Sequence, residues 1–236
     1  MLAAGSTIGI IGGGQLGRML AMAAARLGYR TVVLEPQADC PAAQVANRQI
    51  TAAYDDPAAL AELAAASAVV TYEFENVPVA AANVLAATVP VYPPARALEV
   101  AQDRIVEKTF LNGIGIATAK FQPVDNDGDL ANALAAFNGS GVLKTRRMGY
   151  DGKGQRVFRN MESGGFAGVC ETMGNVPLIL EALVGFEREI SVIGARGTDG
   201  SIATYVPAEN IHREGILRSS TVPAAISAAT ADAARE

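Results

Sequence analysis

The sequence predicts an α/β protein that begins with a Rossmann-like domain built on a parallel sheet. A β-rich run, Thr7–Ile11, leads into a glycine-rich turn and an amphipathic helix, and the next β-rich run ends at Glu35. Further short apolar runs alternate with helical patterns along the chain. Half of the 236 residues are hydrophobic, which suits a packed globular protein and not a disordered one.

In the first hundred residues strands and helices are expected to alternate. The expected strands are Thr7–Ile11, Thr31–Leu34, Gln49–Thr51, Ala68–Tyr72 and Val89–Tyr92. The expected helices are Arg18–Leu27, which Gly28 closes, Asp55–Ala66, which Asp56-Pro57 introduces, and Val79–Ala87. Pro93-Pro94 interrupts this alternation, so we expect a domain boundary near Leu98.

The remaining chain continues with both kinds of element. The expected helices are Ala97–Leu111, Asp129–Phe137 and one that begins in Ala228–Glu236. The expected strands are Lys120–Pro123, Val142–Lys144, Arg156–Phe158, Pro177–Leu180, Ile190–Ala195 and Thr204–Tyr205.

Composition excludes several classes of protein. A net charge of −5 argues against non-specific nucleic-acid binding, and no apolar run is long enough to span a membrane. Met1–Ser6 lacks the basic and apolar regions of a signal peptide. Cys40 and Cys170 form no metal-spaced motif, so we expect them to be reduced and structural, as in a cytoplasmic protein.

The turn after the first strand reads Gly12-Gly13-Gly14-Gln15-Leu16-Gly17. Together with Glu35 at the end of the second strand, it matches the dinucleotide-binding fingerprint, which makes an NAD-dependent oxidoreductase one hypothesis. Alternatively, the turn holds the phosphate of a different ligand at the helix N-terminus, or it is a purely structural turn.

Two carboxylates, Glu73 and Glu75, follow the expected strand Ala68–Tyr72. Ligands of open α/β sheets bind at the carboxyl ends of strands, where a carboxylate can act as a general base or accept hydrogen bonds from sugar hydroxyls. The alternative is a solvated acidic loop.

A strand-end lysine, Lys144, precedes a loop with Gly149, Gly152 and Gly154, and Lys153 lies between the last two. Glycines let backbone N–H groups approach an anion and lysines supply charge, so this arrangement is typical of phosphate binding. With Arg146 and Arg147 the lysines form a basic cluster that suggests a small anionic ligand. The alternative is a glycine-rich hairpin with scattered basic residues.

Other candidates are less specific. Arg104 is either an exposed helical charge or a phosphate contact, and His212, the single histidine, is more often structural than catalytic. Carboxylates, among them Glu181 and Glu189, bracket the apolar linker between two expected strands, which is unusual for a pure core.

These stretches together resemble ATP-grasp enzymes of purine biosynthesis, in particular the 5-(carboxyamino)imidazole ribonucleotide synthase family. The resemblance runs from about Thr7 to the end of the chain. It rests on IGGGQLGRML, YEFENVP, QDRIVEK, LKTRRMGYDGKGQ, EALVGFEREISVIGAR and NIHREGILRSSTVPA.

The resemblance implies three regions: a Rossmann-like substrate domain over residues 1–98, an ATP-grasp small lobe over 99–180 and an incomplete large lobe over 181–236. It implies that three residues hold the ribonucleotide: Gln15, Leu16 and Glu73. The residues that it assigns to ATP are Arg104, Lys144, Gly149, Tyr150, Asp151, Gly152, Lys153, Gly154, Gln155, Glu181, Ala182, Leu183, Val184, Glu189 and His212.

The implied reaction has two steps. Bicarbonate attacks the γ-phosphate of ATP to give carboxyphosphate, and the amine of aminoimidazole ribonucleotide then takes up the carboxyl group. Closure of the Tyr150–Gln155 loop would exclude water, with Tyr150, Asp151 and Lys153 facing the substrates as catalytic candidates. Mg²⁺ bridging phosphate oxygens and a cytoplasmic homodimer are also implied.

The family's later segment with metal ligands has no counterpart in this sequence, so we expect a truncated large lobe and no carboxylase activity of this chain alone. Three alternatives stay open. They are another ATP-grasp enzyme of the glycinamide ribonucleotide transformylase or biotin carboxylase type, an NAD-dependent oxidoreductase and a non-catalytic nucleotide-binding module.

Overall fold

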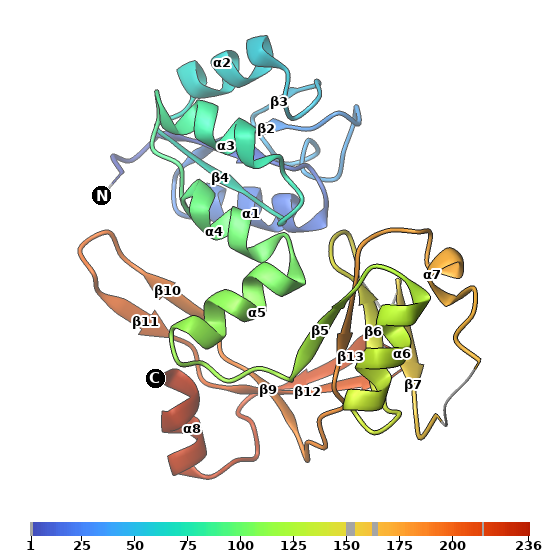
Figure 1. The fold of residues 1–236 in the computed structure, drawn as a ribbon. Coiled ribbons are helices and arrows are strands. Elements are labelled where there is room, and N and C mark those ends of the chain that lie inside the picture. Colours follow the sequence, from blue (N-terminus) through green and yellow to red (C-terminus); the bar gives the residue numbers. More distant parts are fainter. Residues whose placement is uncertain (1, 150–153, 162–164, 214) are drawn as a thin grey trace. The chain divides into compact units, whose positions relative to one another are not determined.

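The computed structural model describes residues 2–149, 154–161, 165–213 and 215–236 (Figure 1). The chain divides into two compact units, Met1–Thr118 and Ala119–Glu236, which we call unit 1 and unit 2. The boundaries that the sequence predicts after residues 98 and 180 stay predictions.

Unit 1 contains a four-stranded sheet in the order β3-β2-β1-β4, and all of its strand pairs are parallel. The parallel sheet of the predicted Rossmann-like fold is therefore confirmed. The strands are β1 (Thr7–Ile11), β2 (Arg30–Leu34), β3 (Arg48–Ile50) and β4 (Val69–Tyr72). The helices are α1 (Gln15–Arg26), α2 (Pro57–Ala66), α3 (Val79–Ala86), α4 (Ala95–Ala101) and α5 (Arg104–Gly113).

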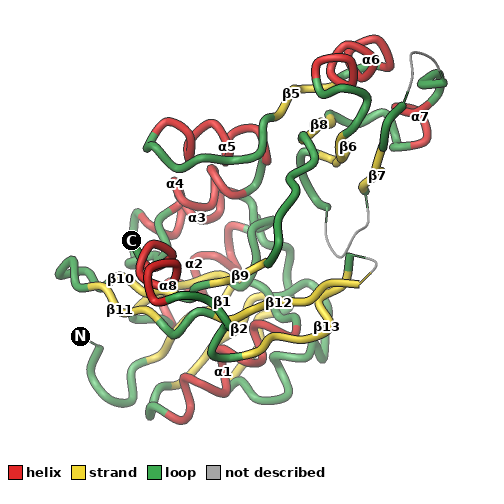
Figure 2. The backbone as a smooth tube through the Cα atoms, turned by 90° about the horizontal axis from the view of Figure 1, so that it is seen from below, coloured by secondary structure: helices red, strands yellow, loops and turns green. Residues whose placement is uncertain are grey.

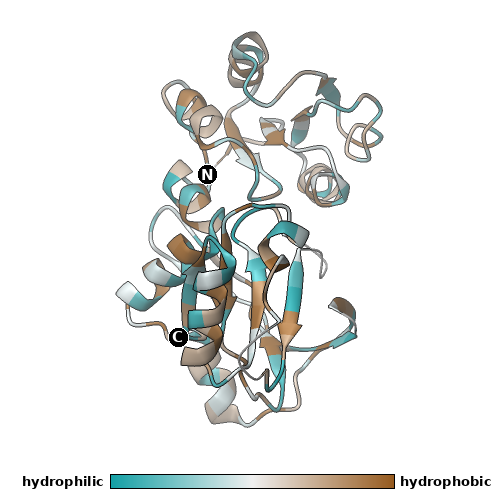
Figure 3. Cartoon of the chain, turned by 45° about the vertical axis from the view of Figure 1, so that its right-hand side comes forward, coloured by the Kyte–Doolittle hydropathy of each residue, from teal (hydrophilic) through white to brown (hydrophobic). Residues whose placement is uncertain are grey.

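Both faces of this sheet are buried. Successive side chains of a strand point to opposite faces, so neighbouring residues pack in two different clusters. Ile10 and Val33 pack in one cluster with residues of α1 and of the segment after β2. Ile11 and Leu34 pack in another cluster with residues of α2, α3 and α4. Figure 3, coloured by hydropathy, shows hydrophobic segments in strands and helices of both units. The result is a helix–sheet–helix sandwich.

Two expected elements of unit 1 are wrong. The helix expected over residues 97–111 is interrupted, because Asp103 has an extended backbone and its carboxylate accepts the Ile105 N–H at 2.9 Å as the N-cap of α5. The strand expected over residues 89–92 is a single parallel bridge between Val70 and Val91. Pro90 and Pro93 flank this bridge and have no N–H group with which to extend it.

Unit 2 begins with an antiparallel sheet in the order β5-β8-β6-β7. Leu143 and Leu180 from its central strands lie in a buried cluster with Leu130 and Leu134 of α6. The strands are β5 (Phe121–Val124), β6 (Gly141–Thr145), β7 (Gln155–Phe158) and β8 (Leu178–Glu181), and the helices are α6 (Asp127–Ala136) and α7 (Val169–Thr172).

The rest of unit 2 forms two smaller antiparallel sheets, which Figure 2 shows in yellow. One has the order β13-β12-β9, and the other pairs β10 with β11. The elements are β9 (Glu189–Ser191), β10 (Gly194–Arg196), β11 (Ile202–Thr204), β12 (Ala208–Arg213), β13 (Ile216–Thr221) and α8 (Ala228–Arg235).

The single strand expected over residues 190–195 is wrong. The chain changes its pairing partner after Ser191, because β9 pairs with β12 whereas β10 pairs with β11. Within the described ranges, no helix is both long and apolar enough to cross a membrane.

Candidate functional site

The glycine turn of unit 1 is capped by a carboxylate from elsewhere in the chain. β1 and β4 are adjacent and parallel, so the turn after β1 and Glu73 after β4 lie at the same edge of the sheet. The Glu73 carboxylate accepts the Gly14 N–H at 2.7 Å and the Gly17 N–H with its second oxygen. A negative charge at this position is favourable, since the N-terminus of α1 carries unpaired donors and the positive end of the helix dipole.

The turn needs glycine because the Glu73 side chain approaches so closely. A Cβ atom at Gly17 would lie 2.6 Å from the Gly12 carbonyl oxygen and 2.9 Å from Glu73 Oε2. Gly12 also has a φ of +101°, a backbone conformation that residues with a Cβ atom rarely adopt. The solvated acidic loop that the sequence left open is thus wrong for Glu73, whereas the neighbouring Glu75 is exposed.

The acid at the end of β2 is also engaged within the protein. Glu35 Oε2 accepts the Gly13 N–H at 2.8 Å and the Tyr54 O–H at 2.6 Å, and its Oε1 accepts the Gln37 N–H at 3.1 Å. In a dinucleotide-binding protein this acid would accept the ribose hydroxyls, and the turn would hold the pyrophosphate. Here the Glu35 carboxylate and the N–H groups of the turn already form hydrogen bonds within the protein, which argues against the NAD hypothesis.

Gln15 and Leu16 are the predicted ribonucleotide contacts of this turn. They are the first two residues of α1 and both are exposed. A helix provides no internal acceptor for the N–H groups of its first turn. These two donors lie between Gly14 and Gly17, the residues whose N–H groups Glu73 accepts.

A charged pair joins the two central strands of the first sheet of unit 2. Glu181 on β8 is opposite Val142 on β6, so Lys144 lies two positions further along the same face. Lys144 Nζ and Glu181 Oε2 are 2.9 Å apart, and their side chains are only 23% and 10% exposed. Leu143 and Leu180 point to the other face and anchor both strands in the core.

The glycine-rich stretch after Lys144 connects β6 and β7 as an antiparallel hairpin, in which Lys144 is opposite Gln155. The Thr145 N–H donates to the Gly154 carbonyl at 2.9 Å and closes the base of the loop. Arg146, Arg147 and Gly149 lie on the first arm of the loop. Four predicted site residues lie outside the described residues: Tyr150, Asp151, Gly152 and Lys153.

The chain leaves β8 through Ala182, Leu183 and Val184, which the family resemblance assigns to ATP. The Ala182 N–H donates to the Lys120 carbonyl at 2.8 Å, and exposure increases from Glu181, which is buried, to Val184, which is exposed. This segment provides backbone groups next to the Lys144–Glu181 pair.

The structure brings together two further predicted residues. Glu189 on β9 is opposite Asn210 on β12, and His212 lies further along β12. Their side chains meet with His212 Nδ1 and Glu189 Oε1 3.1 Å apart. Glu189 and His212 belong to unit 2. Arg104, another residue predicted to contact ATP, is the first residue of α5 and belongs to unit 1.

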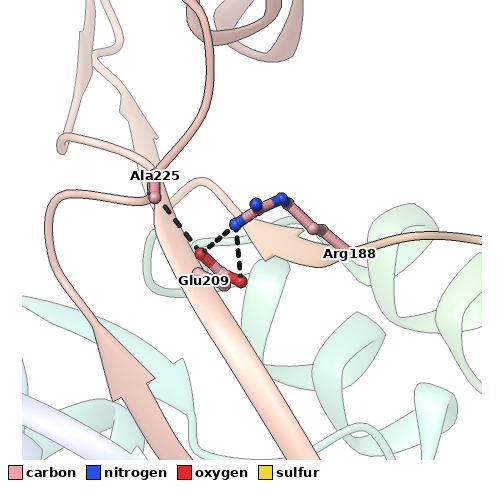
Figure 4. Close-up of polar contacts among 3 residues, drawn as sticks. All are labelled: Arg188, Glu209 and Ala225. Carbon is pink, nitrogen blue, oxygen red and sulfur yellow. Dashed lines mark hydrogen bonds and ion pairs between the residues drawn. The ribbon is translucent and has the colours of Figure 1, made fainter.

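A second ion pair stabilises the same small sheet, and the sequence reasoning missed it. One guanidinium nitrogen of Arg188 lies 3.0 Å from each carboxylate oxygen of Glu209, which also accepts the Ala225 N–H at 3.4 Å (Figure 4). Glu209 is opposite Ile190, the residue after Glu189, so this clamp fixes the register of β9 on β12.

Tyr54 was missed as well. It follows β3 at the same edge of the sheet as the glycine turn, and the parallel-strand rule applied to β3 would have found it.

The two cysteines are free and buried, as predicted. Burial, followed by a hydrogen bond to Asp127, raises the pKa of the Cys170 thiol to about 11, so it is not a reactive thiolate. In the part of the chain that the structure describes, no three His, Cys, Asp or Glu side chains cluster as metal ligands.

Comparison with known proteins identifies both regions. A family model described as the ribonucleotide synthetase preATP-grasp domain matches residues 5–102, and the ATP-grasp domain model matches residues 109–236. The N5-carboxyaminoimidazole ribonucleotide synthase of Brucella melitensis is 62% identical over 231 residues, which cover 98% of this chain and 64% of that protein. The synthase of Pseudomonas aeruginosa is 44% identical over 89% of this chain and 58% of its own length.

Solved structures agree. The N5-carboxyaminoimidazole synthetase of Staphylococcus aureus complexed with ADP has a TM-score of 0.91 and 37% identity, and the match covers 98% of this chain and 61% of that one. The Aspergillus clavatus synthase in complex with ADP and 5-aminoimidazole ribonucleotide has a TM-score of 0.82 and 25% identity over 98% and 60%. This chain therefore spans about three-fifths of the length of these relatives, the predicted resemblance is confirmed, and the chain belongs to the ATP-grasp family.

Proposed function

We propose that this chain carries the ribonucleotide-binding and ATP-binding regions of an enzyme that carboxylates 5-aminoimidazole ribonucleotide. The substrates are bicarbonate and ATP, and the products are 5-(carboxyamino)imidazole ribonucleotide, ADP and phosphate. The Brucella and Pseudomonas relatives are named for this product, and the Aspergillus structure contains ADP with the aminoimidazole ribonucleotide.

The Lys144–Glu181 pair is the observation that carries the proposal. A partly buried ammonium at a strand end supplies a positive charge for a phosphate, and Glu181 begins the segment whose backbone edge would pair with adenine. The Glu189–His212 pair would hold the ribose side of the same nucleotide. In addition, we assign to ATP the residues Arg104, Gly149, Tyr150, Asp151, Gly152, Lys153, Gly154 and Gln155.

The glycine turn would hold the second substrate. The N–H groups of Gln15 and Leu16 suit the phosphate of the ribonucleotide, since α1 offers them no internal acceptor. The Glu73 carboxylate lies next to them, and each of its oxygens accepts one N–H group of the turn, which leaves a second lone pair for a hydroxyl or amine donor of the same molecule. N–H donors next to a carboxylate acceptor suit a ligand that has an anionic group at one end and several hydrogen-bond donors elsewhere.

The proposed reaction passes through carboxyphosphate. A bicarbonate oxygen forms a bond to the γ-phosphorus as the bond to ADP breaks, and the exocyclic amine then takes the carboxyl group, with release of phosphate and a proton. Such transfer depends on positioning and on neutralising the phosphate charges. Tyr150, Asp151 and Lys153 are proposed to face the substrates from a loop that excludes water.

Magnesium enters the proposal as the usual partner of ATP phosphates. The described residues provide no cluster of three metal ligands, so we assign none of them to this ion and route no step through it.

A cytoplasmic location and a homodimer extend the proposal. Two buried free cysteines fit a reducing compartment, whereas the homodimer rests on the family resemblance alone. Sedimentation equilibrium of the purified chain tests the dimer, and a single species of monomer mass would contradict it.

Isothermal titration of the chain with ATP, NAD and 5-aminoimidazole ribonucleotide tests the proposed ligands. We expect binding of ATP and of the ribonucleotide but not of NAD. Lys144→Met should weaken ATP binding about 10-fold or more, because a charge-assisted hydrogen bond contributes about 1.5–3 kcal/mol. The control is Lys120→Met, which makes the same change at an exposed lysine. Binding of NAD alone would overturn the assignment.

A further inference from the structure

Tyr54 contacts Glu35, one carboxylate support of the glycine turn, and Phe74, the neighbour in sequence of the other support, Glu73. Its hydroxyl donates to Glu35 Oε2 at 2.6 Å, and the same oxygen accepts the Gly13 N–H. Its ring packs against Phe74 with ring centroids 5.9 Å apart and an interplanar angle of 59°. Phe74 directly follows Glu73, the residue that accepts the Gly14 and Gly17 N–H groups. One side chain therefore bonds one of the two carboxylates that hold the turn and packs against the residue that follows the other.

The hydroxyl keeps its proton over the whole physiological range. Burial, followed by the hydrogen bond to Glu35 and the negative charges of Glu35 and Glu73, raises the pKa of Tyr54 well above its ordinary value. Tyr54 is thus a constant hydrogen-bond donor to Glu35. A tyrosine that acts as a proton carrier would need a pKa shifted in the opposite direction.

The space around this network is smaller than the usual site of a drug-sized ligand or cofactor. The cavity lined by Gly13, Glu35, Tyr54 and their neighbours has a volume of about 150 Å³. Sites for drug-sized ligands and cofactors have volumes of about 300–1,000 Å³. Glu35 already accepts hydrogen bonds from Gly13, Gln37 and Tyr54, so these groups support the turn.

We propose that Tyr54 is a positioning residue that fixes the glycine turn for ribonucleotide binding. It holds Glu35 through its hydroxyl and Phe74 through its ring, and it thereby orients the start of α1, where the N–H groups of Gln15 and Leu16 are presented. The effect of Tyr54 on ribonucleotide binding rests on the proposed function. Its effect on the position of the glycine turn is independent of that function.

Hydrogen exchange without any ligand tests the contact with the turn. We expect Tyr54→Phe, which removes the hydroxyl and keeps the ring, to increase the exchange rate of the Gly13 N–H about 10-fold. This factor corresponds to the lower end of the contribution of a hydrogen bond to a charged group. The matched control is Tyr29→Phe, which removes a hydroxyl 3.4 Å from the Leu2 carbonyl in the same unit. It should leave exchange at Gly13 unchanged. Equal exchange in wild type and Tyr54→Phe would overturn the proposal.

Ligand affinities test the consequence. Tyr54→Phe should weaken 5-aminoimidazole ribonucleotide binding about 10-fold and change the affinity for ATP less than 2-fold. Glu35→Gln should have a similar effect on the ribonucleotide, and the double variant should lose no more than either single variant, since both act through the same contact. Equal losses for both ligands would reveal a general loss of folding and overturn the positioning role.

The two failures are distinguishable. If wild type binds no ribonucleotide, the proposed function fails, and exchange at Gly13 still decides whether Tyr54 holds the turn. If wild type binds the ribonucleotide and Tyr54→Phe binds it equally well, the proposed function stands and the positioning role is wrong.

Discussion

The two candidate binding regions neutralise their charged groups in opposite ways. In unit 1 the fixed partners are backbone N–H groups at the start of α1, and the acceptor is the side chain of Glu73. In unit 2 the Lys144 side chain supplies the positive charge, and Glu181 on the neighbouring strand holds it. Backbone donors cannot move away from their carboxylate without unwinding the helix, whereas a lysine can turn toward a phosphate. The comparison predicts a rigid site in unit 1 and an adjustable one in unit 2.

The largest effect is expected on removing Lys144. Lys144→Met removes the ammonium that lies 2.9 Å from the mostly buried Glu181 carboxylate, and breaking a buried pair in this way costs about 3 kcal/mol. Urea denaturation measures the loss. Adding Glu181→Gln to Lys144→Met should recover part of the stability, because it removes the buried negative charge from which the ammonium was taken away. A double variant less stable than Lys144→Met would contradict this account of the pair.

A smaller effect is expected at Glu73. Glu73→Gln replaces one of the two accepting oxygens with a donor, so either Gly14 or Gly17 loses its partner at a cost of about 2 kcal/mol. The free energy of unfolding in urea measures this loss, and Glu75→Gln is the control at an exposed neighbour. Equal losses at the two positions would show that Glu73 does not cap α1.

The Arg188–Glu209 clamp should contribute less, because much of the pair is exposed to solvent. Exposed pairs contribute about 0.2–1 kcal/mol. A double-mutant cycle with Arg188→Gln and Glu209→Gln should therefore give a coupling energy of about 0.5 kcal/mol, and the coupling should decrease in 1 M salt. A coupling above 2 kcal/mol would show that the clamp is shielded from solvent.

The last prediction concerns the effect of acid on Asp127, which caps α7 much as Glu73 caps α1. Its carboxylate accepts the Cys170 N–H at 2.9 Å and the Gly168 N–H at 2.6 Å. These bonds, that of Cys170 first, hold the pKa of Asp127 below its ordinary value of 3.8. A lowered folded-state pKa stabilises the protein above the unfolded pKa, and this stability is lost as the pH falls through the folded value.

Melting temperatures measured from pH 6 to pH 3 test this prediction. Wild type should lose more stability below about pH 4 than Asp127→Asn does. Parallel curves for the two proteins would contradict the role of Asp127 as a cap.

Local patterns were sufficient to predict the strands β1, β2 and β4, the glycine turn and the Lys144 strand end, because each depends on residues close together in the sequence. Helix breaks were harder to predict. Asp103 reads as one more polar residue in a helical pattern, and only its N-cap hydrogen bonds separate α4 from α5. The division of residues 190–195 between two sheets depends on partners that arrive later in the chain.

The sequence by itself determined the α/β fold and the places of the glycines, the strand-end lysine and several carboxylates at turns and strand ends. Tertiary structure alone decided how these charges are paired. Glu73 is 59 residues from Gly14, Lys144 is 37 residues from Glu181, and Tyr54 is 19 residues from Glu35. Such pairs depend on which strands become neighbours, and strand order is set by contacts between segments far apart in the sequence, which no local pattern encodes.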